Sequence, residues 1–266
     1  MAFWIYPKTP SILPRHVSLY REDMGLDVYL CGSGPSLKDV SNEDIRVPGA
    51  LIVGINHSYP HIRPDIHICM DDPSCMENIL WSEPFMKILR GGFQERTFHG
   101  IPMRHMHNLY YADCRKWDKS EEENIFINKP DTQKDRTVFY WNQNSIGITL
   151  HMLLYMGAKR IHLLGSDLDN SKEQYYDSSL NKPDDEIERG QGAYNEIFRH
   201  YKFFAETAPK YGVEIISCSP DSKINEIMPY IDLNLAVENT KRRKNLPVIK
   251  PLTGKQAEAL HNKGSV

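Results

Sequence analysis

The sequence predicts an α/β protein with a mostly parallel sheet and helices on both faces of that sheet. Three observations support this fold class. Short apolar segments of strand length alternate along the chain with helical stretches. Each apolar segment ends in small or polar residues, chiefly glycine, serine, asparagine and aspartate. One helix and the strand that follows it, within 144–167, carry clear cap and turn residues.

Five segments are expected to be buried strands, because they are short, apolar and bounded by turn residues. They are 27–31, 50–53, 66–70, 161–164 and 213–217. In open parallel sheets, ligands bind outside the carboxyl ends of the strands. The residues that end these segments are therefore the first candidates for a functional site.

Two helices are expected between the later strands. Asn144 and Ser145 offer an N-cap for a mostly apolar helix, which Gly157 closes. The second helix is expected over roughly 193–210. Between the 161–164 strand and this helix, the polar segment 170–191 is too long for an ordinary loop. It is expected to be either partly disordered or a lid-like insertion that is mobile when empty and orders over bound ligand.

The composition is that of a globular protein. Of the 266 residues, 40% are hydrophobic and 25% are charged, and the net charge of −3 argues against a strongly electrostatic nucleic-acid binder. Residues 1–239 are predicted to form one domain, and 240–266 a basic surface tail that could make weak contact with a membrane surface. The sequence leaves the oligomeric state open.

The cysteines and the apolar runs predict a cytoplasmic protein. Five cysteines lie far apart, and no pair has the CxxC spacing of a zinc or redox site, so reduced thiols are expected. No apolar run reaches the roughly 18–20 residues of a membrane span. The first residues do not have the pattern of a signal peptide, and no transmembrane segment is expected.

The turn after the first strand is a candidate phosphate site. Gly32, Ser33 and Gly34 would let the backbone approach a phosphate, and Ser36 could cap the next helix in a capping box with Asp39. The turn lacks the third glycine of a dinucleotide fingerprint and the lysine of a P-loop. An ordinary strand-to-helix turn is the alternative.

Other strand ends offer further candidates, each with a structural alternative. Asn56 could read a base or sugar edge, or form a turn. Asp71 and Asp72 could hold Mg²⁺, or cap the next turn. Asn144 and Ser145 could form a second anion or hydroxyl site, or a plain N-cap.

The tyrosines and histidines complete the candidates. The hydroxyl of Tyr175 or Tyr176, in the polar insertion, could donate a hydrogen bond to a leaving phosphate. The eleven histidines are scattered and show no HExxH pattern, so no metal-binding histidine site is expected. His162 lies within a strand and is expected to be packed.

These segments resemble two groups of proteins. The residues that carry the resemblance are, in chain order, 32–37, Asn56, 144–147 and 157–167. They are similar to bacterial CMP-sialic-acid-dependent sialyltransferases, which have a Rossmann-like fold, and to the superfamily of archaeal hydroxymethyl-dihydropterin pyrophosphokinase and motility-associated glycosylation proteins. The similarity covers roughly 27–72 and 136–225.

The sialyltransferase resemblance implies a set of donor-binding residues and two assisting tyrosines. The implied donor site is Gly32, Ser33, Gly34, Ser36 and Asn56, with Asn144 and Ser145 beside it. Ser166 and Asp167, where the 161–164 strand ends, are further predicted substrate-binding residues. Tyr175 or Tyr176 would match one tyrosine, and Asp169 or Asn170 stands in place of the other. The histidine that serves as base in that group is expected before the 193–210 helix, where 190–192 reads Gly-Gln-Gly.

The preferred hypothesis is a Rossmann-like, glycosyltransferase-like enzyme that binds a nucleotide-sugar donor, with a CMP-linked sugar as a candidate and no cofactor. One alternative is a Mg²⁺-dependent pyrophosphokinase with Asp71 and Asp72 on the metal. Another is a non-catalytic member that binds a nucleotide or a partner. The sequence does not indicate the acceptor.

Overall fold

The computed structural model describes residues 25–93, 96–98, 100–103, 106, 108–116, 138–141, 144–168, 175–180 and 197–243. The internal contacts of the chain divide it into two compact units. Unit 1 contains Pro64–Gly157, and unit 2 contains Asp23–Arg63 and Ala158–Ile249. The expectation of one domain over 1–239 stays a prediction.

Unit 2 is built on four parallel strands in the order β10-β9-β1-β2. The strands are β1 (Asp27–Cys31), β2 (Ala50–Ile55), β9 (Arg160–Leu164) and β10 (Glu214–Ser217). Its α-helical segments are α1 (Asn42–Ile45), residues 197–207 and α5 (Leu233–Lys241). Its 3-10 turns are η1 (Pro35–Asp39), η2 (Asn56–Ser58), η7 (Ser178–Leu180), η8 (Ala208–Tyr211) and η9 (Lys223–Glu226).

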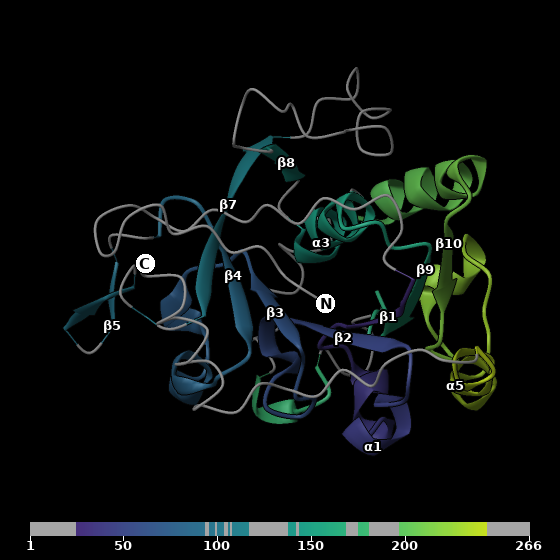
Figure 1. Cartoon of the computed structure of the whole chain (residues 1–266), viewed down its shortest axis with the longest axis horizontal. Helices are drawn as coiled ribbons and strands as arrows, with labels where there is room; N and C mark the ends of the chain where they lie inside the picture. The colour runs from purple at the N-terminus through teal and green to yellow at the C-terminus, as the bar shows by residue number, and fades with distance from the viewer. Residues whose placement is uncertain are drawn as a thin grey trace. The chain divides into compact units, whose positions relative to one another are not determined.

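The central strands of unit 2 are buried on both faces, which explains their continuous apolar sequences. Within unit 2, Figure 1 shows α1 and α5 on one side of the sheet and the helix of residues 197–207 on the other. Tyr29 and Ile52 pack on the α1 and α5 side, together with Ile45 and Val237. The predicted fold class, parallel strands with helices on both faces, is confirmed.

Unit 1 also contains four parallel strands, in the order β3-β4-β7-β8. They are β3 (Ile66–Cys69), β4 (Met86–Arg90), β7 (Leu109–Lys116) and β8 (Val138–Trp141). The helix α3 (Ser145–Tyr155) packs on β8 and β3. The remaining elements are the 3-10 turns η3 (Pro73–Cys75) and η4 (Asn78–Ser82) and the antiparallel pair β5 (Thr97–Phe98) and β6 (Ile101–Pro102).

Two local predictions need correction. Ser36 and Asp39 do not form a capping box, because Ser36 lies inside η1. The capping box lies one turn later, where Ser41 and Asp44 cap each other's backbone at the start of α1. The predicted tail boundary at 240 falls inside α5, where Thr240 is fully buried. Residues 240–243 are therefore part of unit 2, and the rest of the predicted tail lies outside the described residues.

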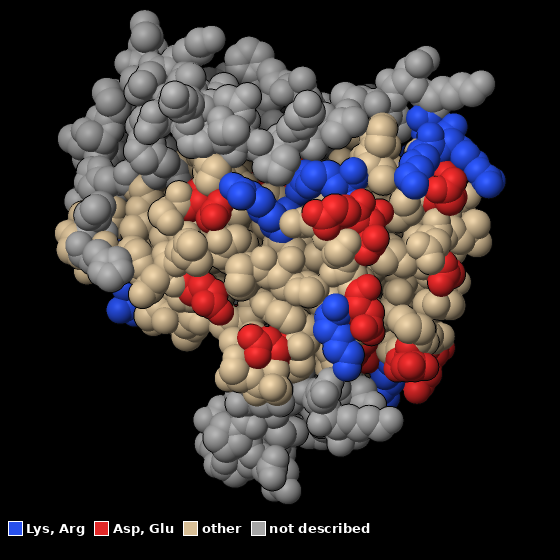
Figure 2. Space-filling model, turned by 90° about the horizontal axis from the view of Figure 1, so that it is seen from below, with Lys and Arg blue, Asp and Glu red and all other residues tan. Residues whose placement is uncertain are grey.

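The surface charges, the cysteines and the helices can be compared with the class of protein that the sequence predicts. In Figure 2, Lys and Arg side chains are intermixed with Asp and Glu side chains on the face that is visible. All five cysteines are free, and three of them are buried. Within the described ranges, no helix combines the length and the apolar character that a membrane crossing needs.

Lys87 of β4 is a fully buried lysine in unit 1. Its ammonium donates to the carbonyls of Glu83 and Phe85, and it lies 5.1 Å from the centroid of the Phe85 ring. Burial lowers the pKa of Lys87 from 10.5 to about 7, while the nearby Glu83 carboxylate acts in the opposite direction. In the unfolded chain the same lysine titrates near its ordinary value. The unfolded state therefore binds the proton more tightly than the folded state does.

We expect the free energy of unfolding to rise with pH between about 7 and 10, because there the unfolded chain holds more protons. The full stabilisation is present above the pKa that Lys87 has in the unfolded chain. It is lost as the pH falls through the lower pKa that Lys87 has in the folded protein. In the K87M variant this rise of the unfolding free energy with pH, up to about 1.4 kcal/mol per pH unit, should be absent. Urea unfolding of both proteins at pH 7 and pH 9 measures this difference. Equal pH dependence in the two proteins would contradict a lowered pKa at Lys87.

Candidate functional site

The carboxyl ends of the four strands of unit 2 lie at one edge of its sheet, since all four strands are parallel. From β1 the chain continues to β2 on one side, whereas β9 and β10 extend the sheet on the other side. The strand order thus reverses between β1 and β9. Ligands of open α/β sheets bind at such a reversal, outside the carboxyl ends of the strands.

The turns that follow β1 and β9 interlock at this point. The Gly32 N–H donates to the Leu164 carbonyl at 2.7 Å, and the Gly34 N–H donates to the Gly165 carbonyl at 2.8 Å. The Ser36 N–H donates to the Asp167 carboxylate at 3.0 Å. The predicted residues Gly32, Gly34, Ser36 and Asp167 are therefore brought together.

The glycines are explained by this close packing. A Cβ on Gly32 would lie 2.4 Å from the Gly165 backbone oxygen, and one on Gly34 would lie 2.8 Å from the same oxygen. Such separations exclude any side chain, whether or not a ligand is bound. The Asp167 carboxylate also accepts the Ser36 N–H, so within the described residues this backbone donor is already used inside the protein. The ordinary-turn alternative accounts for the glycines, and donor binding by this turn stays a prediction.

Two serines after β10 join the same edge, and the sequence analysis missed both. The hydroxyls of Ser36 and Ser219 lie 2.9 Å apart. The hydroxyl of Ser222 donates to the Ser166 carbonyl at 2.7 Å, which ties the turn after β10 to the turn after β9. The signal was available, because small polar residues follow the 213–217 segment as they follow the other predicted strands.

Asn56 lies directly after β2 in a strained conformation. Its φ is 48°, in the left-handed region that non-glycine residues rarely adopt. Its side-chain oxygen is buried, and no described residue hydrogen-bonds to it. The hydroxyl of Ser58, two residues on, is likewise buried and has no hydrogen-bond partner among the described residues. Both oxygens can accept a hydrogen bond from a polar group outside the described residues.

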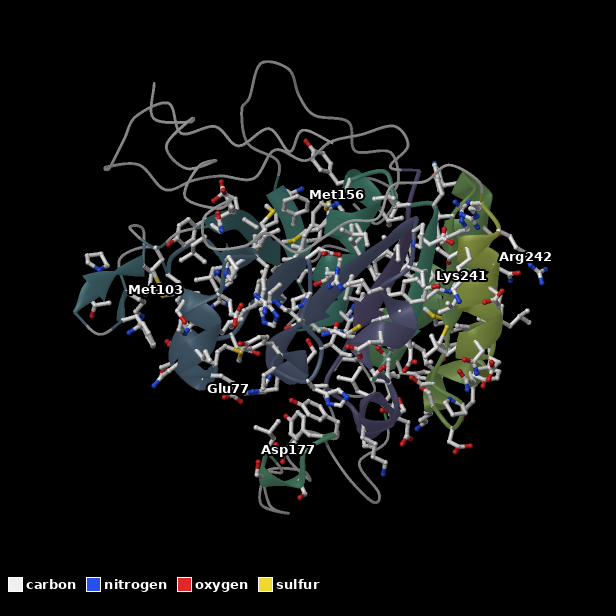
Figure 3. The ribbon with its side chains drawn as sticks, turned by 60° about the horizontal axis from the view of Figure 1, so that its bottom comes forward. Glu77, Met103, Met156, Asp177, Lys241 and Arg242 are labelled. Carbon is white, nitrogen blue, oxygen red and sulfur yellow. The ribbon has the colours of Figure 1, made fainter. Side chains whose placement is uncertain are left out.

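The described part of the predicted insertion, 175–180, is attached to this edge of unit 2. The Tyr176 N–H donates to the Ser33 carbonyl at 3.1 Å, and the Tyr176 ring packs against the hydrophobic core cluster and lies 4.9 Å from the His61 ring. The Tyr175 ring contacts His57 edge-on, with ring centroids 6.0 Å apart. Asp177 follows these rings and is exposed (Figure 3). The remainder of 170–191 lies outside the described residues.

The two tyrosines therefore differ in surroundings. Tyr176 has a structural role, because its backbone and ring both anchor the segment. Tyr175 lies beside the turn that contains Asn56 and His57. Of the two catalytic candidates, Tyr175 is the one whose position is compatible with a ligand at that turn. The predicted packing role of His162 is confirmed: it is buried and stacks on Tyr29 at 4.9 Å.

Asn144 and Ser145 belong to unit 1. The Asn144 side-chain oxygen accepts the Ile146 N–H at 2.9 Å, so the N-cap interpretation is confirmed. Gly157 closes the helix with a φ of 81°, as expected. The substrate-binding role implied for Asn144 and Ser145 stays a prediction.

Asp71 and Asp72 follow β3, also in unit 1. One oxygen of Asp72 accepts from the backbone and hydroxyl of Ser74, and the other pairs with Arg96 at 3.2 Å. The hydrogen bonds from Ser74 lower the pKa of Asp72. The turn-capping alternative is therefore confirmed for Asp72. Within the ranges that the structure describes, no group of three or more metal-ligating side chains is found.

A shallow depression of about 410 Å³ borders η1 and α1 and includes Lys38, Asn42 and His61, so it flanks the turn after β1. Asp169, Asn170 and the segment 190–192, to which the resemblance gave roles, lie outside the described residues.

No protein-family model matches the chain, and no curated protein matches it. Among solved structures, the chain is similar to the sialyltransferase CstII from Campylobacter jejuni in complex with the substrate analogue CMP-3FNeuAc. The identity is 10%, over 90% of this chain and 99% of that chain, with a TM-score of 0.44. An α-2,3-sialyltransferase from Campylobacter jejuni in apo form is 14% identical, over 92% and 96% of the two chains, with a TM-score of 0.43. The resemblance to the pyrophosphokinase group finds no support in these comparisons.

Proposed function

We propose that the protein is a glycosyltransferase-like enzyme that binds a nucleotide-sugar donor at the carboxyl edge of the unit 2 sheet. The observation that carries this proposal is Asn56, whose strained backbone and buried, unsatisfied oxygen lie at the end of β2 among the described residues. Strain of this kind persists where surrounding structure enforces it, and it concentrates at functional sites. A CMP-linked sugar is the first donor to test, because of the sequence resemblance.

Asn56 and its neighbours have the chemistry that a nucleotide-sugar requires. A side-chain amide oxygen accepts a hydrogen bond from an amino group or a hydroxyl, and nucleotide-sugars offer both. Asn56 follows β2, and β2 pairs directly with β1, so the turn lies next to the reversal in strand order. The Asp167 carboxylate on Ser36 makes that turn less suited to a phosphate than a free helix N-terminus would be. The proposal therefore assigns the base or sugar to Asn56 and leaves the phosphate contacts unassigned.

Tyr175 is the proposed donor of a hydrogen bond to the leaving phosphate. As the bond between sugar and phosphate breaks, negative charge grows on the phosphate oxygen, and a hydroxyl donor there stabilises the transition state more than the ground state. We expect the Y175F variant to keep its nucleotide affinity within a few fold and to lose about ten-fold or more in turnover. Donor-consumption kinetics beside a binding titration on the same preparation measure both quantities.

The Y176F variant is a matched control for this experiment. It removes the same hydroxyl one residue away, but the Tyr176 ring and N–H keep their packing and their hydrogen bond to Ser33. Turnover of this control should change by less than about three-fold. Full turnover in Y175F would remove Tyr175 from the mechanism. Absence of turnover in the wild type with every nucleotide-sugar tested would favour the non-catalytic alternative.

A further inference from the structure

We infer that Asn225 contacts the base of the bound nucleotide and selects a base that carries an exocyclic amino group. This inference rests on the proposed function and deepens it, because it names the part of the ligand that each side of the site would hold. Asn225 lies in η9, the 3-10 turn that follows β10 in unit 2. It is not among the candidates that the sequence predicts.

The side-chain amide of Asn225 is held in one orientation. Its Nδ2 atom donates to the Ser219 carbonyl at 3.0 Å and to the Pro220 carbonyl at 2.9 Å. A carbonyl oxygen only accepts hydrogen bonds, so both contacts require the nitrogen end of the amide. A rotation of the amide by half a turn would lose both hydrogen bonds. The Oδ1 atom of Asn225 is therefore a fixed acceptor.

This acceptor has a capacity that the described residues do not use. The Oδ1 atom of Asn225 is buried, and no described residue hydrogen-bonds to it. Such an atom is costly unless a donor reaches it, and a ligand or a water molecule can supply one. The residue as a whole is only half-buried, so it lies at the surface of unit 2.

The turn that contains Asn225 is fastened to the carboxyl edge of the unit 2 sheet. The Lys223 N–H, in the same turn, donates to the Asp167 carbonyl at 3.0 Å. The hydroxyl of Ser219, whose carbonyl accepts from Asn225, lies 2.9 Å from the hydroxyl of Ser36. Asn225 is thus tied to the turns after β1 and β9, between which the strand order reverses. Ligands of open α/β sheets bind at this place.

Buried oxygens to which no described residue hydrogen-bonds occur in the turns after β2 and after β10, and their chemistry differs. After β2, the Oδ1 atom of Asn56 is accompanied by the Ser58 hydroxyl, which can both donate and accept. This pair suits the ribose, whose hydroxyls also donate and accept. After β10, Asn225 offers an acceptor alone, which suits a group that only donates. The exocyclic amino group of cytosine or adenine is such a group.

The fixed amide also gives a reason to reject a uracil base. Uracil carries an acceptor oxygen where cytosine carries its amino group, so two acceptors would face each other without a proton between them. Asn225 cannot present its Nδ2 atom instead, because the Ser219 and Pro220 carbonyls hold it. A site built to hydrogen-bond one group of a ligand discriminates strongly against an analogue that lacks this group, since the buried partner stays unpaired.

Calorimetric titration of the full chain with CMP and with UMP tests this inference without any need for turnover. We expect the wild type to bind CMP about ten-fold or more tightly than UMP. In the N225A variant the two affinities should lie within about three-fold of each other, chiefly through a loss of CMP affinity. The ratio is the informative quantity, because a distorted turn would weaken both nucleotides alike. The N225S variant replaces N225A if the latter does not fold.

The N234A variant is the control, since Asn234 is an exposed asparagine of α5 in the same unit. It should keep the wild-type ratio of the two affinities. Equal affinity of the wild type for CMP and UMP would overturn the role of Asn225, and so would an unchanged preference for CMP in N225A or N225S. In both cases the bound CMP leaves the proposed function standing. If the wild type binds neither nucleotide, the proposed function fails and this inference fails with it.

Discussion

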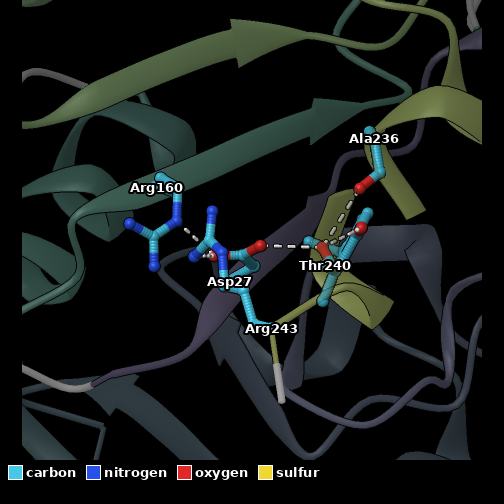
Figure 4. A network of polar contacts seen from close by, with 6 residues as sticks. Asp27, Arg160, Ala236, Thr240 and Arg243 are labelled. Atoms are coloured by element: carbon cyan, nitrogen blue, oxygen red, sulfur yellow. Dashed lines mark hydrogen bonds and ion pairs between the residues drawn. The ribbon is translucent and has the colours of Figure 1, made fainter. Parts of the chain in front are cut away.

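The D27A variant should lose about 3 kcal/mol of unfolding free energy. Asp27 is 1% exposed at the start of β1, and its carboxylate pairs with Arg160 at 2.6 Å and with Arg243 at 2.5 Å. It also accepts the Thr240 hydroxyl at 2.7 Å, and the Thr240 oxygen can then accept from the Tyr29 hydroxyl at 2.8 Å, with the Ala236 carbonyl oxygen 3.1 Å away. Figure 4 shows Asp27 between Arg160 and Arg243, with Thr240 on its other oxygen.

Removal of one partner from a buried charge cluster typically costs 3–5 kcal/mol, because the remaining charges lose their compensation. Arg160 and Arg243 keep 28% and 31% of their side chains exposed, so water can partly replace Asp27. We therefore place the loss at the lower end of that range. The E238A variant, which removes an exposed pair with Lys241, should unfold at nearly the same urea concentration as the wild type. Urea unfolding measures both, and a loss below 1 kcal/mol in D27A would contradict this account of Asp27.

The G32A variant is expected to destabilise the fold by about 2–3 kcal/mol or more. The added methyl group would lie 2.4 Å from the Gly165 oxygen and 3.1 Å from the Gly165 carbonyl carbon. Both atoms belong to the backbone, so the turns after β1 and β9 would have to separate, with loss of the hydrogen bond from Gly32 to Leu164.

The G147A variant is the control for this change. A methyl group there meets only Asn144, at 3.7 Å, and alanine is the better helix former, so stability should stay constant or rise slightly. Thermal and urea unfolding compare the two variants. If G32A were as stable as the wild type and lost only nucleotide binding, Gly32 would serve the ligand and not the packing of the two turns.

The bounds of apolar strands that have turn residues at their ends could be predicted well from the sequence. The expected strand 27–31 matches β1, and the expected helix cap at Asn144 and Ser145 matches the start of α3. These elements are specified locally, by a run of apolar residues and a capping side chain. The helix expected over 193–210 is observed as helix over 197–207 followed by the 3-10 turn η8.

The strands β4, β7 and β8 were missed, and the reason is physical. Met86–Arg90 contains a lysine that only tertiary packing buries, and Leu109–Lys116 ends in exposed polar residues. The strand character of β4 and β7 depends on partners distant in the sequence. The Val-Phe-Tyr-Trp run of β8 is rich in strand-forming residues, so a local signal was available there and was missed.

The sequence predicted which residues lie at the candidate site better than it predicted what each of them does. The glycine turn, Asn56, Ser166 and Asp167 do come to one edge of unit 2, as strand ends in a parallel sheet must. The sequence could not show that Asp167 would cap Ser36, because the two residues are 131 positions apart. Nor could it show that Tyr176 packs while Tyr175 contacts His57. Such pairings depend on the register of strands and on the path of the chain between them.

Calorimetric titration of the wild type with CMP, beside the N56G variant, tests nucleotide binding at Asn56 most directly. Glycine suits the φ of 48° at this position, so the variant removes the amide without adding backbone strain. We expect saturable binding of CMP to the wild type, with a rise in melting temperature at saturating ligand. In N56G the affinity should fall about ten-fold or more at equal stability. Absence of CMP binding in the wild type, or equal affinity in N56G, would contradict the account.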